Sequence, residues 1–487
     1  MTPAGIELLT IGEMGRADAL AVASGVPSLD LMEAAGTAIV EAIAKRWSPR
    51  DTVILCGPGN NGGDGFVVAR LLSGLGWPVR VGLFGDYAAL KGDARINAGR
   101  WTGPVETLSV GLLDGTGLVV DALFGAGLAR PLDGAAKDAV QAINDRSLPC
   151  VGVDVPSGVY GDSGEILGAA PRCALTVTFF RKKPAHLLQP GSDLCGEIVL
   201  ADIGISSAVV TDIQPRIFEN APELWRTHFR VPGANSHKYT RGHALIIGGG
   251  EMTGAARLAA RAARRVGAGM VTIAAPKKAV PIFLAGDPGQ LVIEMDEKTD
   301  IESLMSEKKR SAVLVGPGNG ADMTTERRTI QALRSRAPAV IDADALTVFQ
   351  DRPRDLVRWV RGACVLTPHD GEFARLFDTS WDRLTRTRRA AETSGAVVLL
   401  KGAATIIAAP DGRAVINLAS PWLATAGTGD VLSGLIVGLL AQGIPAFEAA
   451  CAGAWLHSAA GAEIGPGLIA EDISERLPGI LPHLLAS

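Results

Sequence analysis

The sequence predicts an α/β protein with two domains, on the evidence of its length, its short apolar runs and its glycine-rich turns. At 487 residues the chain exceeds the usual size of one hydrophobic core, so two or three domains are expected. Runs rich in Val, Ile and Leu alternate with longer Ala/Leu-rich helical segments along the whole chain. Such runs are typical of parallel strands that helices bury on both faces.

The predicted strands occur in both halves of the chain. In the first half they are Val53–Cys56, Val79–Phe84, Leu118–Asp121, Cys150–Asp154 and Ala174–Phe179. In the second half they are Ala244–Ile247, Met270–Ala274, Ala312–Val315, Ala339–Ile341, Cys364–Leu366, Val397–Leu400 and Ala404–Ile407. Pro and Asn interrupt the periodicity near Asp212–Arg230, which predicts domains of residues 1–220 and 221–487.

Composition limits the class of protein. The net charge is −4 and the acids and bases are interspersed, which argues against a nucleic-acid or membrane-surface partner. The six cysteines are scattered without metal-binding spacing, as in a reduced cytoplasmic protein. The charged N-terminus is not a signal peptide, and the most apolar helix candidate, Val431–Ala441, is too short to span a bilayer. We therefore expect a soluble protein, and its Ala/Gly-rich helices suit a homo-oligomer.

A glycine-rich turn at Gly57–Gly65 follows the first predicted strand and precedes a helix. Turns of this kind bring backbone N–H groups and a helix N-terminus up to an anionic ligand. Asn60, Asn61 and Asp64 stand among the glycines, and a plain phosphate site does not need them. The turn is therefore expected to hold more than a phosphate.

Two further strand ends carry acids, Asp121 and Asp154, and Ser157 follows the second. Because the carboxyl ends of parallel strands meet at one edge of a sheet, these groups and the Gly57–Gly65 turn can converge on one crevice. Their oxygens suit a hard cation. Alternatively, each acid caps the turn after it, although three such strand ends together make this less probable.

In this order, the motifs Leu31–Gly36, Gly57–Gly65, Asp121–Leu128 and Asp154–Gly158 resemble the NAD(P)H-hydrate epimerase domain. The resemblance implies a Rossmann-like three-layer sandwich that interconverts the R and S forms of hydrated NADH and NADPH. It implies that the hydrate is contacted by Asn60, Asn61, Gly62, Gly63 and Asp64, that its pyrophosphate meets Gly125, Ala126, Gly127, Leu128, Ala129, Arg130 and Pro131, and that its modified ring meets Asp154. It also implies a potassium ion held by Asn61, Asp121 and Ser157.

Epimerisation needs a group that takes or gives a proton near the hydrated ring, and a carboxylate such as Asp154 can do this. Lys182 or Lys183, after a predicted strand, could assist it. The alternative for both lysines is a solvated strand end.

The second half carries the turn Ala424–Asp430, which runs into an apolar helix. Its glycines let the backbone approach a negative group, and the helix dipole stabilises that group. Asp430 is placed to accept a proton from a substrate hydroxyl. The alternative is that Asp430 only caps the helix.

With this turn, other motifs resemble the ribokinase-like fold and, within it, the NAD(P)H-hydrate dehydratase family. These motifs are Gly248–Gly250 leading to Gly254–Ala256, Gly316–Asn319, Asp342–Leu346, Thr367–Glu372 and Lys401–Thr405. The resemblance implies that ADP, with Mg²⁺ screening its charge, is bound by Lys401, Gly402, Ala403, Ala404, Thr405 and Gly429. It implies that Ala255, Gly318, His369 and Asp430 contact the hydrate, with Asp430 as the base. For His369, a satisfied strand-end polar residue is the alternative.

The sequence thus predicts a bifunctional nicotinamide-nucleotide repair enzyme. Its first domain would epimerise the hydrates, and its second would dehydrate the S form to NAD(P)H with ADP, giving AMP and phosphate. In the alternative interpretation, the second domain is a vitamin or sugar kinase and the first is a non-catalytic dinucleotide-binding module.

Overall fold

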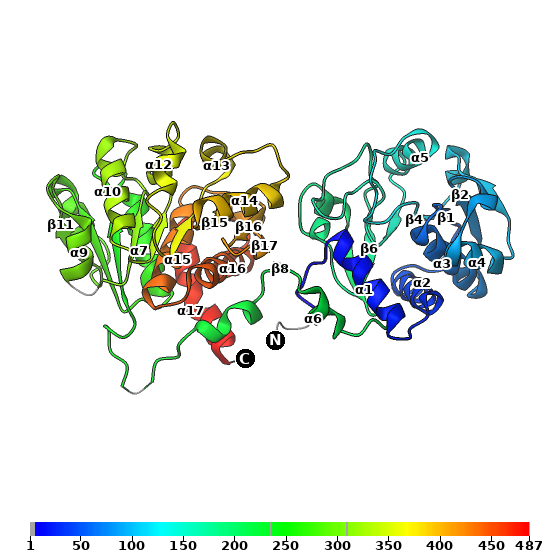
Figure 1. Ribbon diagram of the computed structural model, residues 1–487, viewed down its shortest axis with the longest axis horizontal. Helices are drawn as coiled ribbons and strands as arrows, with labels where there is room; N and C mark the ends of the chain where they lie inside the picture. The colour runs from blue at the N-terminus through cyan, green and yellow to red at the C-terminus, as the bar shows by residue number, and fades with distance from the viewer. Residues whose placement is uncertain (1–4, 234, 308–309, 487) are drawn as a thin grey trace. The chain divides into compact units, whose positions relative to one another are not determined.

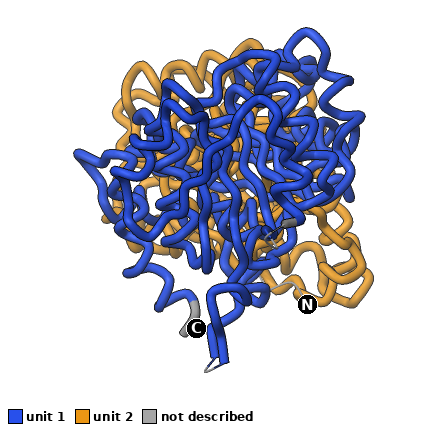
Figure 2. The backbone as a smooth tube through the Cα atoms, turned by 90° about the vertical axis from the view of Figure 1, so that its left-hand side faces the viewer, with its two compact units in different colours: residues 1–3, 219–487 blue, residues 4–218 orange. Residues whose placement is uncertain are grey.

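The computed structural model describes residues 5–233, 235–307 and 310–486. The chain divides into two compact units, and the boundary between them falls between Phe218 and Glu219 (Figure 2). Both units are built from a sheet with helices on its faces, so the predicted α/β class is confirmed. Within the described residues, no helix has both the length and the hydropathy needed to cross a membrane.

A seven-stranded parallel sheet forms the centre of the N-terminal unit (Figure 1). Its strands are β1 (Thr52–Cys56), β2 (Val79–Leu83), β3 (Val105–Thr107), β4 (Leu118–Ala122), β5 (Cys150–Val153), β6 (Leu175–Phe179) and β7 (Glu197–Ala201). They lie in the order β3-β2-β1-β4-β5-β6-β7. The order reverses between β1 and β4, and open α/β sheets bind ligands at the carboxyl ends of strands at such a switch point.

Helices cover both faces of this sheet. They are α1 (Ile11–Ala23), α2 (Ser28–Ala44), α3 (Asn60–Gly74), α4 (Gly92–Arg100), α5 (Gly134–Asp145) and α6 (Val209–Ile213). Along β1, Ile54 joins the core formed with α1, α2 and α3, whereas Val53 and Leu55 join the core formed with α5. Successive side chains of a strand point to opposite faces, so the buried run of β1 supports two cores and three layers.

The C-terminal unit contains most of a ten-stranded sheet in the order β11-β10-β9-β12-β13-β14-β15-β16-β17-β8. The strands are β8 (Ile217–Glu219), β9 (His243–Ile247), β10 (Met270–Ala275), β11 (Leu291–Glu294), β12 (Ala312–Val315), β13 (Ala339–Ile341), β14 (Cys364–Leu366), β15 (Val397–Leu400), β16 (Ala404–Ala408) and β17 (Ala414–Leu418). Strands β9 to β15 are parallel. We predicted that the run Ala404–Ile407 is also parallel, and this was wrong, because β16 runs antiparallel to β15 and β17. The connection from β15 to β16 is too short for a crossover helix.

The helices of this unit include one that is buried along its length, α15. They are α7 (Thr253–Arg265), α8 (Val280–Leu284), α9 (Ile301–Glu307), α10 (Met323–Arg334), α11 (Asp344–Thr347), α12 (Pro353–Val357), α13 (Asp370–Leu376), α14 (Arg383–Ser394), α15 (Thr428–Ala441), α16 (Ala446–Ile464) and α17 (Ala470–Ala486). Every residue from Val431 to Ala441 is buried, as expected of a core helix. A Cβ on Gly434 would lie 2.3 Å from the carbonyl oxygen of Ala259, so glycine is needed where α15 packs on α7.

Candidate active sites

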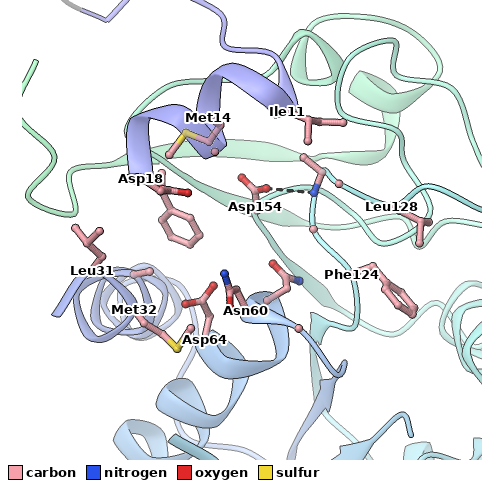
Figure 3. Close-up of a pocket in the computed structure, with 18 of the residues that line it drawn as sticks. Ile11, Met14, Asp18, Leu31, Met32, Asn60, Asp64, Phe124, Leu128 and Asp154 are labelled. Atoms are coloured by element: carbon pink, nitrogen blue, oxygen red, sulfur yellow. Dashed lines mark hydrogen bonds between the residues drawn. The ribbon is translucent and has the colours of Figure 1, made fainter. Parts of the chain in front are cut away.

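A cavity of about 710 Å³ lies in the N-terminal unit, where loops follow the carboxyl ends of β1, β4 and β5 (Figure 3). Most of the residues expected to contact the hydrate line it. They are Asn60, Asn61, Asp64, Gly125, Ala126, Gly127, Leu128, Ala129, Arg130 and Asp154. The structure therefore brings the glycine-rich turn and two strand ends together, as the parallel sheet requires.

Three residues of the expected set, Gly62, Gly63 and Pro131, are not among those that line this cavity. The two glycines have a packing role. A Cβ on Gly62 would lie 1.8 Å from the carbonyl oxygen of Gly57, and one on Gly63 would lie 2.7 Å from the sulfur of Met32. The absence of side chains therefore lets the first turn of α3 pack against its own loop and against α2.

Asp154 and Lys183 form an ion pair at the cavity wall. Lys183 Nζ donates to Asp154 Oδ1 at 2.5 Å and to Thr178 Oγ1 at 3.0 Å. The Lys183 side chain is 2% exposed and that of Asp154 is 17% exposed. The interpretation of Lys183 as a solvated strand end is therefore wrong.

The environment of Asp154 stabilises its charged form. Burial disfavours that form, but the charge and the hydrogen bond of Lys183 outweigh burial, and the pKa of Asp154 is lowered. Ala126 N also donates to Asp154 Oδ2, at 3.3 Å. Asp154 has a φ of 67°, a left-handed conformation that is strained for a residue with a side chain.

Three other carboxyl groups line this cavity: Asp64 from α3, Asp18 from α1 and Asp93 from α4. Burial, together with the charges of Asp154 and Asp18, raises the pKa of Asp64 well above its ordinary value. Asp18 was not predicted from the sequence. Its helix lies before the glycine-rich turn and also carries Glu13 and Arg16, so the sequence gives no sign that Asp18 faces a site.

Asp121 and Ser157, two of the expected potassium ligands, are fully buried and lie together. Ser157 Oγ donates to Asp121 Oδ1 at 2.7 Å, and Ser157 N donates to Asp121 Oδ2 at 2.8 Å. Asp121 also accepts from Leu123 N at 3.4 Å, so it does in part cap the turn after β4. Burial raises the pKa of Asp121, and across the described chain its carboxylate forms no ion pair.

The third expected ligand, Asn61, lines the cavity, and its buried Nδ2 has no hydrogen-bond partner in the described protein. Its Oδ1 lies 3.1 Å from the position that a Cβ on Gly125 would take. The donor set is thus a carboxylate, a hydroxyl and an amide oxygen, which suits a hard cation. No group of three or more His, Cys, Asp or Glu side chains in the described parts of the chain is placed to hold a metal ion.

The C-terminal unit has a second carboxylate–lysine pair, formed by residues that follow β13 and β15, with β14 between these two strands. Lys401 Nζ, after β15, donates to Asp342 Oδ1 at 2.8 Å, and Ser433 Oγ, from α15, donates to Asp342 Oδ2 at 2.5 Å. Burial opposes the charge of Lys401, but Asp342, Glu372 and Asp430 outweigh it and raise the pKa of the lysine. Asp342 was part of a motif but had no predicted role, although it directly follows a strand, as Asp154 does.

Asp430 lies in the first turn of α15, near this pair. Burial and the charge of Asp342 raise its pKa to about 6, although Lys401 acts in the opposite direction. The residue that caps the helix is Gly427, with a φ of 89°, so the alternative role of Asp430 as the cap is wrong. A half-buried carboxyl with a pKa near the working pH is suited to general-base chemistry.

The residues expected to bind the nucleotide lie near the Lys401–Asp342 pair and the start of α15. Lys401–Ala403 connect β15 to β16, which begins with Ala404 and Thr405. Thr405 Oγ1 donates to the carbonyl oxygen of Gly402 at 3.0 Å and holds this turn. Lys401 Nζ lies 3.8 Å from the position that a Cβ on Gly429 would take, which places the lysine beside the start of α15.

The remaining expected hydrate contacts lie on three elements. Gly318 has a φ of 66°, and a Cβ on it would lie 3.3 Å from the Cβ of Ala255, so these two residues are neighbours. His369 forms a β-bridge with Lys401 and caps α13, where its Nδ1 accepts from Gly371 N at 3.0 Å. The ring is thus partly satisfied, as in the alternative interpretation, yet its side chain is 58% exposed.

The chain is similar to known proteins along nearly its whole length. Residues 28–185 match the family described as YjeF-related protein N-terminus, and residues 244–478 match the family described as NAD(P)H-hydrate dehydratase. A bifunctional NAD(P)H-hydrate repair enzyme from Moorella thermoacetica is 37% identical, over 98% of this chain and 97% of that protein. The chain belongs to the family of bifunctional NAD(P)H-hydrate repair enzymes.

Other members of the repair enzyme family and one solved structure agree with this assignment. The family member from Escherichia coli is 33% identical, over 96% of this chain and 92% of its own. A ribokinase-like superfamily protein from Enterococcus faecalis is 25% identical and has a TM-score of 0.50, covering 56% of this chain and 97% of that chain. The resemblances inferred from the motifs of both halves, and the ribokinase-like fold of the second, are thus confirmed.

Proposed function

We propose that this repair enzyme carries out two reactions in one chain. The N-terminal unit interconverts the R and S forms of hydrated NADH and NADPH. The C-terminal unit dehydrates the S form with ADP, giving NADH or NADPH, AMP and phosphate. The observation that carries the proposal is the match to a bifunctional enzyme over 98% of the chain, which includes both carboxylate–lysine sites.

In the proposed epimerase site, Asp154 exchanges a proton at the hydrated ring. Lys183 holds this carboxylate in its charged form. The backbone of Gly125–Arg130 lines the same cavity and would meet the pyrophosphate. The close position of Asn61 and Asp154 around Gly125 supports one ligand that touches both.

The residues present fit the potassium ion that the family resemblance implies. Asn61, Asp121 and Ser157 would hold it. The buried carboxylate of Asp121 is bonded to neutral donors, and a cation would offset its charge. When bound, the ion would supply a positive charge near the pyrophosphate.

In the proposed dehydratase site, Asp430 accepts the proton of the substrate hydroxyl, and the hydroxyl oxygen attacks the terminal phosphorus of ADP, releasing AMP. The C–O bond then breaks, its electron pair leaves with phosphate, and loss of a neighbouring proton forms the double bond. Lys401 and the start of α15 would bind the nucleotide phosphates, and Mg²⁺ would screen their charge. Phosphate leaves far more readily than hydroxide, which is why the nucleotide is needed.

The test supplies the full-length protein with a mixture of R and S hydrates and with either ADP or ATP. We expect complete conversion to NADH by absorbance, with one phosphate released per molecule repaired, and faster conversion with ADP. A phosphorylated hydrate that accumulates would instead indicate a kinase. Conversion that stops once the S form is exhausted would indicate that the N-terminal unit only binds the dinucleotide.

A further inference from the structure

Asp18 faces the epimerase cavity from a different wall than Asp154. It extends from α1, whereas Asp154 follows β5, and Figure 3 shows both side chains at the cavity with Asp64 below them. Asp18 is exposed as a whole residue, although its carboxyl group is partly surrounded by the protein at the cavity. In the part of the chain that the structure describes, its carboxylate makes no hydrogen bond or ion pair, so it is available to a ligand.

The helix that carries Asp18 is held firmly. Thr10 and Glu13 form a capping box at its start, and Ile11 N donates to Asp162 Oδ1 at 2.7 Å. Ala17 and Ala21 are buried, which orients the helix and sends the intervening Asp18 toward the cavity. The free carboxylate is therefore fixed in position, as a residue that acts on a substrate needs to be.

The charged groups that line the cavity with Asp18 are Lys183, Arg130, Asp154, Asp64 and Asp93. Burial and the charge of Asp154 raise the pKa of Asp18 to about 6, although Lys183 acts in the opposite direction. The same lysine lowers the pKa of Asp154. The pKa is thus raised at Asp18, as it is at Asp64, and lowered at Asp154, and carboxyl groups whose pKa values are moved apart in one cavity can serve as an acid and a base.

We propose that Asp18 is a second catalytic residue of the epimerase and touches the hydrated ring on the side opposite Asp154. This inference rests on the proposed epimerase function. The R and S hydrates differ at the carbon that bears the added hydroxyl, so the hydroxyl has to leave one face and return on the other. Proton-transfer groups on two walls meet that requirement, whereas Asp154 alone serves one face.

The step balances with water as the only co-reactant. The Asp18 carboxyl gives its proton to the hydroxyl oxygen, the C–O bond breaks with its electron pair on oxygen, and water leaves a cationic ring. A second water adds to the opposite face and gives a proton to the Asp154 carboxylate. The reverse direction uses the two residues in exchanged roles, so the pair carries one proton in either direction.

The test compares full-length D18N with wild type, using a purified R hydrate and subtracting spontaneous epimerisation. We expect kcat for epimerisation to fall about 100-fold while KM stays within threefold, because the amide cannot give up a proton. D18E should recover at least a tenth of the wild-type kcat. The wild-type epimerisation rate should also fall as pH rises through about 6, because Asp18 and Asp154 then lose the one proton that they share. The rate of D18N should not show this decrease with pH.

Two controls separate the possible failures. D30N makes the same carboxylate-to-amide change on the exposed surface of α2, outside the cavity, and should leave kcat unchanged. Dehydration of pure S hydrate by D18N should match wild type, which shows an intact chain. A kcat for D18N within tenfold of wild type, or a loss that lies in KM alone, would overturn the inference. If wild type itself does not interconvert the hydrates, the proposed function fails instead.

Discussion

The two units use the same pair of residue types in opposite orientations. In the N-terminal unit the lysine is the buried partner, with Lys183 2% exposed, and the more exposed Asp154 faces the cavity. In the C-terminal unit the aspartate is buried, with Asp342 2% exposed, and Lys401 is 21% exposed. An ion pair at a strand end can therefore present either charge to a ligand, according to which partner is buried.

This difference matches the two proposed chemistries. A carboxylate held in its charged form suits proton exchange at a ring, and an ammonium beside a helix N-terminus suits nucleotide phosphates. In the C-terminal unit the proposed proton acceptor is a separate residue, Asp430, whose pKa is raised to about 6 instead of lowered. In the proposed mechanism, the lysine therefore lowers the pKa of the reactive acid in one site and binds the phosphates of the co-substrate in the other.

The largest expected effect comes from removing the acceptor of the C-terminal site. D430N should lower the dehydration rate on pure S hydrate about 10³-fold, because the amide cannot accept the hydroxyl proton. Epimerisation by the same variant should stay within twofold of wild type. Loss of both activities would show that the two sites are not independent.

D154N should give the converse result, with epimerisation reduced about 10²-fold and dehydration of S hydrate retained. Hydrate binding, measured by calorimetry, should persist because the cavity lining is otherwise unchanged. If binding is lost together with the rate, Asp154 acts as a binding group and not as a proton carrier.

Because the buried partner is the lysine in one ion pair and the aspartate in the other, we expect the aspartate and lysine variants to rank in opposite order of stability in the two units. Removing the exposed partner leaves a buried charge uncompensated, which costs about 3 kcal/mol. D154N should therefore destabilise its unit more than K183M does, and K401M should destabilise its unit more than D342N does. Denaturant unfolding of the four variants measures both orders, and the same order in both units would contradict the comparison.

A tenfold effect is expected from pH. Asp430 accepts a proton only when it is ionised, so kcat/KM for dehydration should rise about tenfold from pH 5 to pH 7, with its midpoint near the pKa of about 6. D430E should keep a rising profile with a displaced midpoint. A profile that is flat over this interval would exclude Asp430 as the base.

The smallest expected effect is that of potassium. Replacing potassium by a bulky organic cation should lower the unfolding free energy of the N-terminal unit by about 1 kcal/mol, because the ion binds only the folded protein. The thermal midpoint of that unit reports the change. D121N should make the midpoint insensitive to potassium, and a dependence that survives in D121N would place the ion elsewhere.

Most strands inside the two sheets could be predicted because they are buried on both faces and therefore appear as unbroken apolar runs. The edge strands β3, β7 and β11 were missed, since each has exposed residues that interrupt such a run. Strands β17 and β8, beyond β16 in the C-terminal sheet, were missed as well. In the sites, Asp121, Asp154 and Asp430 were found because Asp121 lies near the end of a strand, Asp154 follows a strand and Asp430 follows a glycine-rich turn. Asp18 was not, since only the packing of α1 determines which way an acid on a polar helix points.

The tethering of α1 determines when the epimerase cavity can be completed during protein synthesis. Just before this helix, Leu8 N donates to the carbonyl oxygen of Ile217 at 2.9 Å and Leu9 N donates to that of Lys182 at 3.0 Å, and Glu7 forms a buried ion pair with Arg181. All three partners come much later in the chain than α1. The segment before α1 therefore leaves the ribosome well before the residues that it docks on, and such long-range contacts slow folding. The cavity wall that carries Asp18 can take its final position only after those later residues have been synthesised.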